Sequence, residues 1–261
     1  MRDELTGLLR GAPHELRKWL ENPTAARVRL TALIIIVGFG SYGLTVGLWR
    51  APEMGAYVAF KMPALILITL ASNGLLNGIL GLLLGSGLGF KQSLLAQLMS
   101  FAIAAMILGT LAPVTFFMAL NAPSADSAGA TAAHANFLVT HTALIAFAGV
   151  MANVHLARML IATTPNTRIA GMTMAAWIGG NAFMGAQFSW ILRPFFGTPT
   201  IEVAFLRDHP MQGTFYETVW SSLRSSTGDY ALFVLFIAGF ILLLLHSPLI
   251  TLLRKSTTSK P

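Results

Sequence analysis

Three histidines at helical spacing are the first candidates for chemistry in this sequence. His134, His141 and His155 are separated by 7 and 14 residues, so they share one stripe of a helix. A haem would need a second histidine at a matching depth on another helix, and His246 offers one opposite His155. The other roles are hydrogen bonding between helices and proton relay. We expect hydrogen bonding, and no bound cofactor or metal.

Two asparagines mark a second candidate site. At 100° per residue, Asn73 and Asn77 share less than half of a helix circumference with four glycines. These glycines are Gly74, Gly78, Gly81 and Gly85. Glycine lets helix backbones approach closely and Asn hydrogen-bonds across the contact, which predicts a tight seam between helices. The alternative is the lining of a pore or substrate path, because small residues also leave room for water. We expect the seam.

A third group of polar and aromatic residues surrounds the segment 193–229. Asn181 and Gln187 precede it in an apolar stretch, and the segment itself is punctuated by Pro and Gly. It is either an aromatic belt with a snorkelling arginine or a structured loop that caps a cavity, and a short helix is expected at 214–225. The residues expected at this outer interface are Trp190, Arg193, Pro194, Phe195, Phe196, Arg207, Tyr216 and Trp220.

Several kinds of catalytic site are missing from the sequence. There is no Gly-rich phosphate loop, no HExxH and no GxSxG motif, and there is no cysteine. No Asp or Glu lies inside any apolar stretch, whereas coupled transporters and pumps usually place a carboxylate there. Enzymatic activity and ion-coupled transport are therefore disfavoured.

The composition indicates that lipid is the solvent of this chain. Of its 261 residues 55% are hydrophobic and only 10% are charged, against about 25% charged in soluble domains. So few charges cannot cover the surface of a water-soluble protein of this size. The net charge of +7 is explained by basic residues beside apolar stretches, so a nucleic-acid partner is not expected.

Six stretches are long and apolar enough to cross a bilayer as helices. They cover residues 30–49, 62–85, 94–118, 137–160, 169–192 and 230–253. With both termini in the cytoplasm, 12 of the 17 Lys and Arg residues lie inside and 5 lie outside. The positive-inside rule favours this topology. We therefore expect an all-α bundle of six transmembrane helices.

The domain organisation expected is simple. Residues 1–28 form a cytoplasmic segment, residues 29–253 form the transmembrane domain, and residues 254–261 form a short basic tail. The first segment contains acidic residues and has no apolar core, which argues against a cleavable signal peptide. After Pro13, one face carries Leu16, Trp19 and Leu20, and we expect it to lie among lipid headgroups as an anchor or to dock a partner.

One segment resembles a known group of sequences. It runs Gln187-Phe-Ser-Trp-Ile-Leu-Arg-Pro-Phe-Phe-Gly197, followed by Phe205-Leu-Arg and Gly213-Thr-Phe-Tyr-Glu. About 30 residues are similar to a pattern in uncharacterised multi-pass proteins of the bacterial inner membrane. The resemblance implies a bacterial inner-membrane protein with a notable fifth loop, and it implies no catalytic residue.

Three functions remain open at this point. The first is a non-enzymatic scaffold, assembly factor or complex subunit with a membrane-protein partner or a second copy of itself. The second is a passive channel or small-solute permease with the outer loop as a lid. Its path would be lined by Asn73, Asn77, Asn181, Gln187 and His141. The third is a haem-bearing electron-transfer subunit.

Overall fold

The computed structural model of the protein describes residues 13–230, 232–235, 237 and 239. Within these residues the chain is helical and contains no strand. Most of the predicted span 230–253, together with His246, residues 1–12 and the tail 254–261, lies outside the described residues.

Four of the described helices are long and apolar enough to cross a membrane. They are α3 (Ala25–Leu48), α4 (Pro52–Leu83), α5 (Phe90–Asn121) and α6 (Ala130–Thr163). A fifth helix, α7 (Thr167–Leu192), covers the fifth predicted stretch but is not among the four, because its glycines and amides lower its hydropathy. The prediction of a helical membrane bundle is confirmed at this level.

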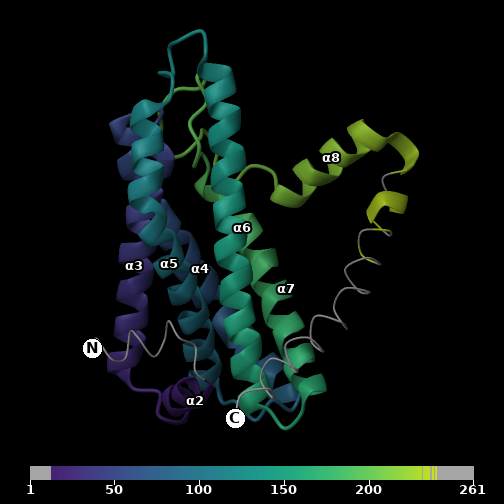
Figure 1. Ribbon diagram of the computed structural model, residues 1–261. Coiled ribbons are helices and arrows are strands. Elements are labelled where there is room, and N and C mark those ends of the chain that lie inside the picture. Colours follow the sequence, from purple (N-terminus) through teal and green to yellow (C-terminus); the bar gives the residue numbers. More distant parts are fainter. Residues whose placement is uncertain (1–12, 231, 236, 238, 240–261) are drawn as a thin grey trace.

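The helices form one elongated bundle in which α3 packs against α4 and α5, and α7 packs against α4 and α6 (Figure 1). Glycines make the α3 contacts possible. A Cβ added at Gly38 would lie 2.3 Å from the carbonyl oxygen of Ala105, and one at Gly47 would lie 2.4 Å from that of Met54. Backbones this close tolerate no side chain, so the closest helix contacts lie along α3.

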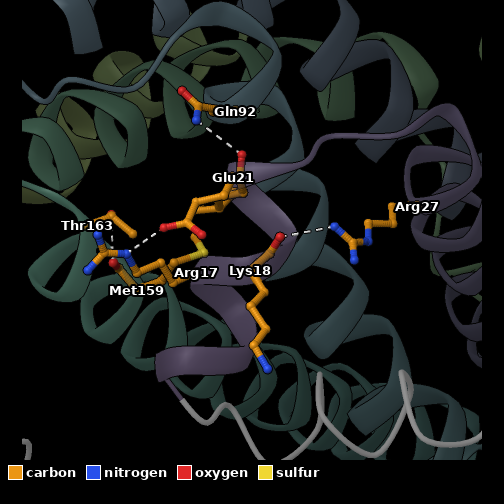
Figure 2. Close-up of polar contacts among 8 residues, drawn as sticks. Arg17, Lys18, Glu21, Arg27, Gln92, Met159 and Thr163 are labelled. Atoms are coloured by element: carbon orange, nitrogen blue, oxygen red, sulfur yellow. Dashed lines mark hydrogen bonds and ion pairs between the residues drawn. The ribbon is translucent and has the colours of Figure 1, made fainter.

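The short helix α2 (Pro13–Glu21) packs against α5 and α6 at one end of the bundle. Trp19 and Leu20 are buried there, with 5% and 1% of their surfaces exposed. Arg27 donates to the carbonyl oxygen of Lys18 (Figure 2) and to that of Trp19. Gln92 donates to the carbonyl oxygen of Leu20. The face of α2 that carries Trp19 and Leu20 was expected to lie among lipid headgroups. Both side chains instead lie against protein, because hydrogen bonds from α3 and α5 fix the carbonyl groups of α2.

The helix predicted at 214–225 is confirmed as α8 (Phe215–Thr227), which is followed by a single 3-10 turn at Gly228–Tyr230. Its start is fixed by a capping box, in which Glu217 N–H donates to the Thr214 hydroxyl and the Thr214 N–H donates to the Glu217 carboxylate. The helix extends sideways from the bundle (Figure 1), and none of its residues is buried.

Candidate functional site

A cluster of four amide side chains joins α4, α5 and α7 inside the bundle. Asn73 and Asn77 each donate to the side-chain oxygen of Asn181, at 3.0 and 3.1 Å. Asn77 also donates to the Gln97 oxygen at 2.7 Å, and Asn181 donates to the same oxygen at 3.0 Å. Asn73, Asn77 and Gln97 are each no more than 1% exposed. We call these four residues the amide cluster.

Two residues of α7 allow the amide cluster to close. The indole N–H of Trp177 donates to the backbone carbonyl of Asn77 at 2.7 Å, and Trp177 is fully buried. A Cβ on Gly180 would lie 2.6 Å from the Asn73 side-chain nitrogen, so a larger residue there would displace the Asn73 amide. The side-chain oxygens of Asn73 and Asn77 are buried and have no hydrogen-bond partner among the residues that the structure describes. The amide cluster is therefore tightly packed, and the side-chain oxygens of Asn73 and Asn77 can still accept hydrogen bonds.

Beside the amide cluster lies a recess of about 250 Å³ between α5, α6 and α7. Its polar lining comes from Gln97, Ser100, Asn153 and Asn181, and the rest is apolar or small. The recess runs from an exposed rim at Ala182 to Gln97, which is 1% exposed. None of the described residues that line it is charged, so it is suited to a neutral molecule.

Three of the four predicted glycines lie within α4, and the fourth follows the end of this helix. A Cβ on Gly78 would lie 2.7 Å from the Phe90 ring, and one on Gly81 would lie 3.4 Å from the Trp177 ring. A Cβ on Gly74 would lie 3.4 Å from a methyl carbon of Leu94. These three face neighbouring helices. Gly85 instead follows the end of α4 with a φ of +77°, so it turns the chain toward α5.

Two histidines of α6, His141 and His155, lie in different surroundings. His141 is fully buried and its Nδ1 lies 2.7 Å from the Tyr42 hydroxyl, whereas its Nε2 has no hydrogen-bond partner within the described ranges. His155 Nδ1 lies 2.9 Å from the carbonyl oxygen of Met151, one turn earlier. Its proposed haem partner, His246, lies outside the described residues. Among the described residues, no group of three His, Cys, Asp or Glu side chains could hold a metal ion.

Residues 193–214, which we call the strap, connect α7 to α8 and are tied to α3 and α4. The ammonium group of Lys61 donates to the Pro194 carbonyl at 2.9 Å and lies 4.9 Å from the centre of the Phe205 ring. Arg50 donates to the carbonyl oxygens of Thr198 and Ile201, at 3.0 and 3.3 Å. The predicted residues Phe195 and Phe196 both pack against the core from the strap. The strap is therefore an ordered part of the fold.

Several contacts fix α8 to α7. The Phe215 N–H donates to the Gln187 side chain at 3.2 Å, and the Tyr216 hydroxyl donates to the Phe183 carbonyl. The Tyr216 and Phe183 rings stack with their centres 4.9 Å apart. The indole N–H of Trp190 donates to the Gln212 carbonyl at 3.4 Å. These contacts hold α8 in one orientation relative to α7.

The predicted arginines of the strap lie near one another. The Arg193 guanidinium stacks 3.4 Å from the centre of the Trp190 ring. Burial, and secondly the positive charge of Arg207, lowers the pKa of Arg193 below its usual value. Arg207 itself is exposed, and Trp220 on α8 is 39% exposed. Of the predicted outer residues, Arg193 is therefore held against α7, whereas Arg207 on the strap and Trp220 on α8 are exposed.

No protein-family model, no curated protein sequence and no solved structure matches this chain. The interpretation of the site therefore depends on its geometry.

The sequence analysis missed four residues of these sites. Lys61 is fully buried, although its position beside an apolar stretch suggested a solvent-facing flank. Gln97 completes the amide cluster, and Tyr42 pairs with His141. Arg50 holds the strap through backbone carbonyls, which no sequence pattern reveals. Gln97 and Lys61 could have been recognised in the sequence as a single amide and a single cation within apolar segments.

Proposed function

We propose that this protein is a bacterial inner-membrane protein with six spans and both termini in the cytoplasm, and that it acts as a non-enzymatic subunit of a membrane complex. The excess of Lys and Arg on one side supports the orientation, and four long apolar helices support the membrane location. In this proposal α8 is the surface that binds the partner protein.

The proposal rests on the contrast between the strap, which is bound to the bundle, and α8, which is exposed. The strap is tied to the bundle by Lys61 and Arg50, whereas α8 has no buried residue. Three of its larger side chains are exposed, with Tyr216 at 36%, Val219 at 44% and Trp220 at 39%. An oriented helix with uncovered aromatic and aliphatic side chains is a preformed surface for another molecule.

The chemistry of α8 favours a protein partner over a lipid surface. Helices that lie on membranes usually carry several Lys or Arg residues on the polar face. The sequence of α8 is FYETVWSSLRSST, with Arg224 as its only basic residue and four serines. Tyr and Trp are the residue types most enriched among the strong contacts of protein interfaces. The partner we infer is therefore a membrane protein with an apolar groove for this helix.

Photocrosslinking in native membranes tests this function. A photoreactive amino acid at Val219 should yield one adduct of fixed mass, and the same protein should co-purify at a fixed ratio without crosslinking. The matched control is Phe147 of α6, which is 56% exposed on the bundle surface and should crosslink mainly to lipid. Trp220→Ala should abolish both the Val219 adduct and the co-purification.

Two outcomes would contradict this form of the proposal. Lipid adducts alone at both Val219 and Phe147 would show that α8 lies on the bilayer. An adduct of two copies of this chain would show that the surface binds itself and no second protein.

Passive passage of a small solute is the second candidate, and the recess beside Asn181 is the observation that favours it. Of the residues proposed for the path, Asn181 lines this recess, Gln187 binds the Phe215 N–H and His141 pairs with Tyr42. Solute flux into reconstituted liposomes that Asn77→Leu abolishes would support this function. Sealed vesicles without flux of ions, sugars or amines would exclude it.

A further inference from the structure

The geometry points to a binding site for a neutral, lipid-soluble ketone or quinone in the recess between α5, α6 and α7, and we propose this as a ligand site separate from α8. The recess holds about 250 Å³. An apolar cavity of about 150 Å³ is enough to bind benzene in another protein. A body of one or two rings therefore fits the available space.

The small residues of α6 create this space. Gly149 lines the recess, and a Cβ built on it would have no atom within 4 Å. Ala152, one turn further along α6, is 4% exposed and also lines the recess, as does Ala104 of α5. Larger side chains at these positions would fill the volume. The recess therefore results from the residue types present.

Hydrogen-bond donors lie at the buried end of the recess. Among the described residues, the Gln97 side-chain nitrogen has one acceptor, the Ser93 carbonyl at 3.4 Å, which is longer than the usual 2.7–3.2 Å. Within the same part of the chain, the Asn181 nitrogen donates to Gln97 alone, although a primary amide has two N–H groups. Their side-chain oxygens already accept bonds within the amide cluster. The site consequently offers donors and suits a ligand with an acceptor such as a carbonyl oxygen.

The lining of the recess and its position along the membrane-spanning helices determine the charge and the lipid solubility of the ligand. In the described part of the chain its lining contains no charged residue, and Phe101 and Ile178 supply apolar contacts. Gln97 lies seven residues after the start of α5, which is roughly 10 Å along a helix that is long and apolar enough to cross the membrane. A ligand must therefore reach the exposed rim at Ala182 through the hydrocarbon region. A charged molecule would be strongly disfavoured there.

Photolabelling with benzophenone, a neutral lipid-soluble ketone, tests the site in the full chain reconstituted into lipid. Labels mapped by mass spectrometry should concentrate on the recess residues of α5 and α6 and should saturate with dose. Gly149→Leu should fill the recess and reduce this labelling about tenfold. Val150→Leu is the matched control, because Val150 is 61% exposed on the same helix, and its labelling should not change.

Two further measurements keep the test decisive. Ala182→Phe at the exposed rim should block labelling as Gly149→Leu does, and it tests the site even if the buried substitution prevents folding. Fluorenone should compete about tenfold more strongly than fluorene, its analogue without the carbonyl oxygen. Labelling spread evenly over the lipid-facing helices and unchanged by either substitution would overturn the site. Equal competition by fluorene would overturn the recognition of a carbonyl group.

Discussion

The side-chain nitrogen of Lys61 on α4 lies 2.9 Å from the backbone carbonyl oxygen of Pro194, and no part of Lys61 is exposed. The ammonium group also lies beside the rings of Phe195 and Phe205, at 6.0 and 4.9 Å from their centres. Among the described residues no carboxylate forms an ion pair with it. The cation is thus stabilised by a carbonyl dipole and by aromatic faces, all of which belong to the strap.

Replacing Lys61 by Met should loosen the strap without unfolding the bundle. Met keeps most of the apolar stem but removes the charge, the hydrogen bond to Pro194 and the cation–π contacts. We expect amide hydrogen exchange over residues 194–207 to rise about tenfold. Global stability should change by less than about 1.5 kcal/mol, because burial of a charge itself costs free energy.

The control for this substitution is Leu75→Ala. Leu75 lies on the same helix and is 63% exposed, so its removal should leave exchange in the strap unchanged. Unchanged exchange in Lys61→Met would show that Arg50 and the contacts of the partly buried Phe196 hold the strap without Lys61.

Replacing Asn181 by Leu should destabilise the contact between α7 and α4. The substitution removes the acceptor shared by Asn73 and Asn77 and leaves their amide groups with fewer partners in a buried setting. We expect a loss of about 1–2 kcal/mol in the free energy of unfolding, measured in mild detergent. Ala175→Leu, at an exposed position of the same helix, should change it by less than about 0.5 kcal/mol. Equal stability of both variants would mean that the cluster contributes little to packing.

Sequence periodicity predicted the helices better than it predicted their contacts. The first five apolar stretches and the helix at 214–225 match described helices, because a long apolar run and a capping box are local properties. Asn73 and Asn77 were assigned to one face, but their partners Gln97 and Asn181 come from helices 20 and 104 residues further along the chain. Such pairings depend on how helices are arranged in space, and a single sequence does not record that arrangement.

The closest helix contacts illustrate the same limit. The seam was predicted on α4, around Gly74 and Gly78, whereas the shortest backbone approaches involve Gly38, Gly43 and Gly47 of α3. Both helices are rich in glycine, so composition does not distinguish them. The difference arises because α3 packs between α4 and α5, which makes its glycines face backbone atoms.

Two glycine substitutions should therefore have opposite effects. In Gly38→Ala the new methyl group would lie 2.3 Å from the Ala105 carbonyl oxygen, so α3 and α5 must separate. We expect a loss of about 1–3 kcal/mol in the free energy of unfolding. In Gly179→Ala nothing lies within 4 Å of the added group, and the higher helix propensity of Ala should leave stability unchanged or slightly increased. A similar effect of both substitutions would contradict the packing of α3 on α5.

The anchoring of α2 gives a last prediction that separates burial from charge. Leu20 is 1% exposed against the bundle, whereas Glu21 forms an ion pair with Arg17 in which both side chains are more than half exposed. Leu20→Ala should release α2, because removing a buried Leu side chain costs about 2–5 kcal/mol. Limited proteolysis near residues 22–24 should then accelerate strongly. Glu21→Ala should leave the cleavage rate nearly unchanged, since exposed ion pairs contribute about 0–1 kcal/mol. Faster cleavage in Glu21→Ala than in Leu20→Ala would show that charge, and not burial, holds α2 on the bundle.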